Sequence, residues 1–103
     1  MNSTQFKQMA DETLQNLSDS LEEADTDYQL DVDLLDGILN IELPDGGQYV
    51  INRHDASMQI WLSSPISGAG HFSYNNGTWL TSDGRNFIDT IKDEIKNATG
   101  VVI

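Results

Sequence analysis

The sequence predicts an α+β fold: a two-layer α/β sandwich in which two helices pack on one face of an antiparallel sheet of about six strands. Apolar residues recur at helical spacing near both ends of the 103-residue chain. Between these segments, short runs of alternating polar and apolar residues are separated by turn pairs such as Asp-Gly and Asn-Gly. This order of helix, strands and helix is typical of a sheet covered on one side, so residues 1–103 are expected to form a single domain.

The first helix is expected over residues 3–24, with Asn2 or Ser3 capping its start. Its apolar stripe consists of Phe6, Met9, Ala10, Leu14, Leu17 and Leu21. Its opposite side is acidic. Ten of the seventeen acidic residues lie within residues 1–36, where Lys7 is the only cation, so the negative charge is concentrated at this end of the chain.

Four strands in meander order are expected to follow the helix. In the first, residues 28–35, Leu30, Val32 and Leu34 alternate with polar residues, which predicts that these three side chains face the core. Asp36-Gly37 is the expected turn into the second strand. The remaining three strands are expected at residues 38–43, 49–52 and 59–62.

Two shorter strands and a second helix are expected to complete the fold. Residues 65–70 contain a proline and two glycines and are expected to form a loop, followed by strands at residues 71–74 and 78–80. Asp83 is the expected cap of a helix over residues 84–98, which Gly100 ends. The core stripe of this helix is predicted to be Phe87, Ile88, Ile91, Ile95 and Ala98. The apolar tail, residues 101–103, is expected to pack against the helices.

The strands at residues 49–52 and 59–62 predict a binding surface. If Tyr49, Ile51, Ile60 and Leu62 point to the core, then Asn52, Gln59 and Trp61 share the opposite face, which no further element of this short chain covers. A tryptophan beside two amides is typical of a protein interface. The alternative is a partly exposed tryptophan that merely covers the sheet.

Composition excludes several classes of function. A formal net charge of −12 disfavours nucleic acid and anionic membrane surfaces as partners. The absence of cysteine excludes disulfides and cysteine-held zinc or iron–sulfur clusters. No apolar run is long enough to span a membrane, and no targeting segment precedes the first helix, so a cytoplasmic protein is expected. No HExxH, phosphate-loop or dinucleotide-loop motif is present, so no catalytic residues are predicted.

A resemblance to a known family adds to this reading. The runs VINR, QIWLSSP and SGAGHF, followed by GTW and by SDG before an amphipathic helix, resemble the frataxin family and its short bacterial orthologs of the CyaY type. His54 and His71 stand where eukaryotic frataxins usually carry Gln and Arg. The resemblance covers nearly the whole chain. It implies a bacterial iron-binding protein that joins the iron–sulfur assembly machinery by contacting the cysteine desulfurase and the scaffold protein.

The resemblance also implies particular site residues. Weakly bound iron, Fe(II) or Fe(III), is expected on an acidic ridge formed by Asp19, Glu22, Glu23, Asp25, Asp27, Asp31 and Asp33. The surface for the desulfurase and scaffold maps to Asn52, Arg53, Gln59 and Trp61. Exposed carboxylates suit such hard or borderline cations, and incomplete coordination predicts low affinity.

Three functions remain open on the sequence alone. The first, which the sequence favours, is a non-catalytic and monomeric iron-binding regulator that iron can drive into oligomers. The second is a ferroxidase or iron-storage protein; it is disfavoured because such centres use buried Glu and His ligands, and neither histidine is expected near the ridge. The third is an acidic protein-interaction domain with no metal role.

Overall fold

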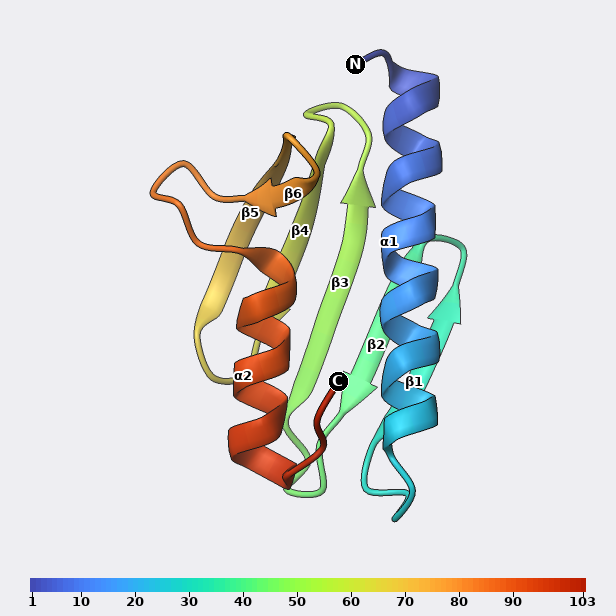
Figure 1. Cartoon of the computed structure of the whole chain (residues 1–103), viewed down its shortest axis with the longest axis vertical. Helices are drawn as coiled ribbons and strands as arrows, with labels where there is room; N and C mark the ends of the chain where they lie inside the picture. The colour runs from blue at the N-terminus through green and yellow to red at the C-terminus, as the bar shows by residue number, and fades with distance from the viewer.

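Both helices cover one face of a six-stranded antiparallel sheet, as expected (Figure 1). The computed structural model describes all of residues 1–103. In chain order the elements are α1 (Ser3–Ala24), β1 (Asp31–Leu35), β2 (Ile38–Glu42), β3 (Gln48–His54), β4 (Gln59–Ser64), β5 (Gly68–Asn75), β6 (Thr78–Leu80) and α2 (Phe87–Thr99). The strands lie in sequence order, so each pairs with its neighbours in the chain. Neither helix is both long and apolar enough to cross a membrane.

Helix α1 forms as its periodicity predicts. Asn2 is the cap: its side chain accepts a hydrogen bond from the Gln5 backbone N–H, and the Gln5 side chain accepts one from the Asn2 N–H. These reciprocal bonds satisfy two donors that a helix start leaves free. The buried stripe is Phe6, Ala10, Leu14, Leu17 and Leu21, and Met9 is half-buried beside it.

Alternation in the central strands sets which side chains enter the core. Leu39 and Ile41 of β2, Tyr49 and Ile51 of β3, and Ile60 and Leu62 of β4 are all buried beneath the helices. The predicted facing of these strands is therefore confirmed. The opposite face has no covering layer, so it is available to a partner.

The first strand is shorter than expected. It begins at Asp31, because the segment before it is a turn: Tyr28 has a φ of 54° and is fully in solvent. Asp25 holds this turn, since its carboxylate accepts hydrogen bonds from the backbone N–H groups of Gln29 (2.9 Å) and Leu30 (2.8 Å). Leu30, Val32 and Leu34 still pack against the core, as predicted.

The predicted loop over residues 65–70 is also shorter, because β5 already begins at Gly68. Only three residues connect β4 to β5. Gly70 lies within the strand and is buried under the Phe72 ring, where an added Cβ would lie 2.8 Å from a ring carbon. Gly70 is therefore required for close packing within the strand, whereas Gly68 is favoured there by its positive φ of 79°.

Helix α2 begins at Phe87 and is capped by Asn86, whose side chain accepts from the Asp89 N–H (3.1 Å). The predicted cap, Asp83, is wrong: it lies in the preceding loop and accepts a hydrogen bond from the Thr81 hydroxyl. Gly100 ends the helix in the left-handed conformation, as expected. The buried stripe is Phe87, Ile91 and Ile95, whereas the predicted members Ile88 and Ala98 are exposed. In the tail Val101 is buried, Ile103 packs against the core and Val102 is exposed.

One carboxylate connects α2 to the sheet. Glu94 accepts hydrogen bonds from the Tyr49 hydroxyl (2.9 Å) and the Ser64 hydroxyl (2.6 Å). Ser64 in turn accepts from the backbone N–H groups of Ile66 and Ser67 in the β4–β5 turn, each at 3.0 Å. Burial, followed by the hydrogen bond to Glu94, raises the pKa of the Tyr49 phenol well above its usual range. The Tyr49 hydroxyl therefore stays a neutral donor inside the core.

Candidate functional site

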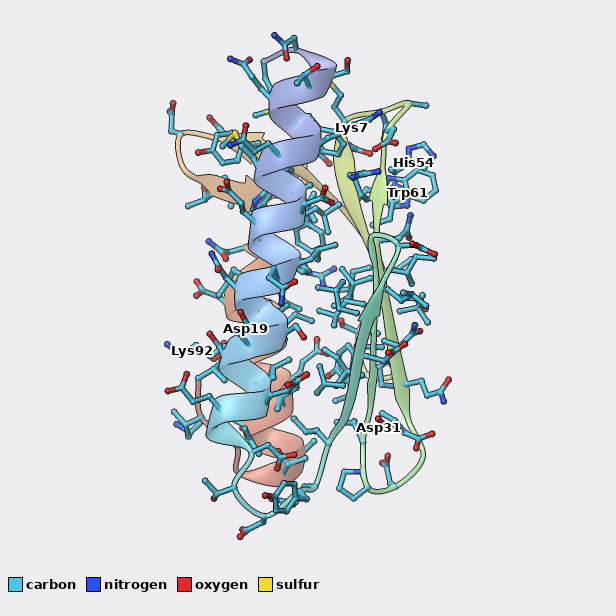
Figure 2. All side chains as sticks on the ribbon, turned by 90° about the vertical axis from the view of Figure 1, so that its right-hand side faces the viewer. Lys7, Asp19, Asp31, His54, Trp61 and Lys92 are labelled. Atoms are coloured by element: carbon cyan, nitrogen blue, oxygen red, sulfur yellow. The ribbon has the colours of Figure 1, made fainter.

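The uncovered sheet face gathers polar and aromatic side chains at one place. Strand pairing puts Trp61 of β4 between Asn52 of β3 and His71 of β5, and it puts His54 opposite Gln59. All five side chains therefore emerge from the face opposite the helices. Figure 2 shows the sheet edge-on, with α1 on one side and the His54 and Trp61 side chains on the other.

Trp61 is the centre of a three-ring stack. The His54 ring lies on one side, with centroids 3.6 Å apart and planes 4° from parallel. The His71 ring stacks with Trp61 at 4.2 Å and 12°. The indole N–H donates to the Gln59 side-chain oxygen (3.0 Å), which fixes the plane of the ring. Trp61 points away from the helices, as predicted, and the two histidine rings are stacked on its faces.

Hydrogen bonds also hold the side chains of Gln59 and His54. The Gln59 amide donates to the Ser73 hydroxyl (3.1 Å), and His54 Nδ1 lies 2.6 Å from the Ser57 hydroxyl. The surface is thus ordered before any partner arrives, which lowers the entropic cost of binding. It offers imidazole and indole edges together with the Asn52 amide. We name Asn52, His54, Gln59, Trp61 and His71 the stacked-ring surface.

Arg53 does not belong to this surface, which corrects its expected grouping with Asn52, Gln59 and Trp61. Alternation places Arg53 on the helix side of β3, like Ile51. There its guanidinium binds both carboxylate oxygens of Asp11 on α1 (2.8 and 2.9 Å) and the carboxylate of Asp55 (2.7 Å). Arg53 therefore ties α1 to the end of β3.

The two histidines are the site residues that sequence reasoning missed. His54 follows Asn52 by two positions, so the alternation already placed it on the uncovered face. His71 lay in an expected strand, but its place beside Trp61 depends on the register between β5 and β4, which was not predicted. No spacing rule predicts a stack of rings from three different strands.

The predicted acidic ridge divides between two surfaces. Asp19, Glu22 and Glu23 are exposed on α1, and Asp27 is exposed in the turn after it. Asp31 and Asp33 are exposed on β1, with side chains on the uncovered sheet face. Figure 2 shows Asp19 in the helical layer and Asp31 in the sheet layer. Nowhere do three acidic or histidine side chains converge as a set able to hold a metal ion.

Asp25 is not a free ligand, which corrects its place among the unpaired carboxylates. The residue is only 6% exposed, and both of its carboxylate oxygens accept backbone hydrogen bonds in the turn before β1. Glu42 instead joins the acids on the sheet, because it lies directly opposite Asp31 and lines a shallow hollow of about 200 Å³ with Asp31 and Asp33. Like charges on facing residues repel, so a cation would relieve this arrangement.

These features define a class: a small two-layer α+β protein that exposes an ordered sheet face and carries many surface carboxylates. Residues 1–101 match the sequence model of the frataxin-like domain, and the chain belongs to the frataxin family. It is 37% identical to the iron–sulfur cluster assembly protein CyaY of Thioalkalivibrio sulfidiphilus, over 95% of this chain and 94% of that protein.

Solved structures agree with this assignment. The fold matches frataxin from Psychromonas ingrahamii with a TM-score of 0.88 and 27% identity, covering 100% of this chain and 96% of that one. It also matches trimeric frataxin from the yeast Saccharomyces cerevisiae, complexed with ferrous iron, with a TM-score of 0.79 and 40% identity over 88% and 85% of the two chains. The family is implicated in iron–sulfur cluster assembly.

Proposed function

We propose that this protein acts in iron–sulfur cluster assembly as a non-catalytic iron-binding regulator that docks on the cysteine desulfurase and its scaffold. The observation that carries the proposal is the match of residues 1–101 to the frataxin-like domain. The similarity of this chain to an iron–sulfur cluster assembly protein, over nearly the full length of both chains, supports the same role.

The stacked-ring surface is the proposed docking site. It is the uncovered side of the sheet, and its side chains are already fixed by stacking and hydrogen bonds. Binding there would bury the edge of Trp61 and satisfy the Asn52 amide and the imidazole nitrogens with partner groups. Aromatic residues surrounded by polar groups commonly dominate the energy of such interfaces.

Iron is the proposed cargo of the exposed acids. The remaining ridge members are Asp19, Glu22, Glu23, Asp27, Asp31 and Asp33, with Glu42 added by its position opposite Asp31. Since no three of these carboxylates converge, each ion would keep water ligands and bind weakly. A related yeast frataxin has been solved with ferrous iron, which supports iron as the ion.

The scattered carboxylates favour this proposal over a ferroxidase. A ferroxidase centre needs several Glu and His ligands around the same ions. Here the two histidines stack on Trp61 instead of joining the acids of α1.

A reconstituted assembly assay tests the proposal. Cluster formation by the desulfurase and scaffold is followed with wild-type protein, with Trp61→Ala and with Val50→Ala, a control on the same sheet face. Trp61→Ala should weaken association roughly thirtyfold or more, the effect of losing about 2 kcal/mol at an anchor residue. Val50→Ala should change it little. No effect of the wild-type protein on the assembly rate, or equal binding by Trp61→Ala, would contradict the proposal.

A further inference from the structure

The outer edge of β5 is unpaired along most of its length. β5 spans Gly68–Asn75, but β6 pairs only with its last three residues. After Leu80 the chain forms a single bridge to Asn86 and then enters α2, so no strand lies beside Gly68–Phe72 on this side (Figure 1). The sheet therefore has room for a further strand.

The backbone of this edge has free hydrogen-bonding groups. Asn75 and Thr78 flank a two-residue turn with positive φ at Asn76 and Gly77, so their backbone groups face each other. Backbone N–H and C=O groups of alternate residues in a strand point to the same edge. Those of Ala69 and His71 therefore point to the same edge of β5 as those of Asn75. No hydrogen bond from a turn, loop or side chain reaches them. Such an edge is a template for an added strand.

A groove already exists where that strand would lie. A hollow of about 410 Å³ separates the β5 edge, at Ala69–His71, from the loop at residues 81–85. The first three residues of β5 are Gly68, Ala69 and Gly70, so no large side chain blocks the approach of another backbone. The edge also lacks the lysine or proline that commonly protects exposed strands.

Arg85 gives the groove a charge preference. Its guanidinium lies over the Phe72 ring (5.9 Å) and contacts the Ser67 hydroxyl (3.4 Å), with Nη1 3.8 Å from the position of a Cβ on Gly70. Unlike Arg53, which binds two carboxylates, Arg85 forms no salt bridge. Asp83 of the same loop is bound by the Thr81 hydroxyl instead. A half-buried guanidinium with free donors is well suited to a carboxylate.

We propose that the β5 edge and Arg85 form a binding site for an extended, carboxylate-bearing segment of a partner protein. The segment adds a strand beside Ala69 and His71, and one of its carboxylates pairs with Arg85. The acids of β1 are too distant to prevent this. β1 lies four strands away, about 19 Å at the usual strand spacing, which exceeds twice the screening length of about 8 Å at physiological salt. The inference does not depend on iron binding or on the partner proposed above.

Peptide titrations of the ¹⁵N-labelled full chain test this site. The probe is a blocked pentapeptide, acetyl-Thr-Val-Glu-Val-Thr-amide, compared with the same peptide carrying Gln for Glu. The amides of Ala69 and His71 should shift, and the Glu peptide should bind roughly fivefold more tightly than the Gln peptide. Arg85→Gln should remove this difference, whereas Lys96→Gln, an equal charge change on α2, should preserve it.

A third peptide separates strand addition from simple charge attraction. N-methylation of alternate backbone nitrogens keeps the carboxylate but removes the donors that pair with β5, so this peptide should bind far more weakly. Equal binding of the Glu and Gln peptides to the wild type, equal binding of the methylated peptide, or no shift at Ala69 and His71 would overturn the proposal. So would shifts of these amides that follow protein concentration without peptide, because they would identify a second copy of this chain as the occupant.

Discussion

Replacing each tryptophan by alanine should have very different effects on stability. Trp79 is 4% exposed, meets the Phe6 and Tyr74 rings edge-on at 6.0 and 5.2 Å, and donates a hydrogen bond to the Thr13 hydroxyl (3.0 Å). Core substitutions of this size cost about 3–5 kcal/mol. For a domain of this length, a loss of about 4 kcal/mol lowers the melting midpoint by roughly 15–30 °C.

Trp61→Ala should cost much less. Trp61 is partly exposed, and its replacement by alanine removes two stacking contacts. Each such contact contributes about 0.5–1.5 kcal/mol in buried pairs, and less here because solvent reaches the surface. We expect a loss of about 1 kcal/mol and a midpoint lower by roughly 4–8 °C.

Thermal and urea denaturation followed by far-ultraviolet circular dichroism measure both effects. Trp79→Phe is the matched control, since it keeps an aromatic ring and loses mainly the hydrogen bond to Thr13, at a cost of about 1 kcal/mol from that bond. A greater loss of stability for Trp61→Ala than for Trp79→Ala would refute the assigned facing of the strands.

Three further predictions concern charge. Since the acids of residues 1–36 repel one another, sodium chloride and divalent cations should raise the melting midpoint; an unchanged midpoint would count against this. Changing four exposed acids together to amides should remove most Fe(II) binding in anaerobic titrations without unfolding the chain, whereas Asp25→Asn should spare binding and cost about 1–2 kcal/mol of stability, as its backbone bonds weaken. The four are Glu22, Glu23, Asp27 and Asp31. Because the pKa of Tyr49 is raised by folding, stability should be fully present below the ordinary tyrosine pKa of about 10 and fall above it; in Tyr49→Phe, pH-dependent melts should show a smaller alkaline loss.

Periodicity predicted the parts of the fold that burial controls. Leu39, Ile51 and Leu62 face the helices because a shift of register by one residue would turn these buried side chains to the solvent face. Helix α1 was predicted with its observed bounds, since a cap and a continuous apolar stripe agree there. These features follow from local sequence and the hydrophobic effect together.

Features that depend on which of several polar groups forms a given hydrogen bond could not be predicted from periodicity. Asp83 and Asn86 are both good helix caps, and the choice depends on the Thr81 hydroxyl, which holds Asp83 in the loop. The free carboxylate expected of Asp25 was lost to two backbone donors that only the turn brings near. The ring stack depends on lateral pairing between strands, which periodicity along one strand does not encode.

The placement of α2 has a consequence for synthesis. Phe87, Ile91 and Ile95 complete the core, yet they come from the last element of the fold to be made. While the ribosome adds residues at about 5–20 per second, the emerging sheet has its apolar face covered by α1 alone. The acidic outer side of α1 is then the solubilising part of an unfinished chain. The core is closed only when α2 packs on the sheet and Glu94 reaches Tyr49 and Ser64.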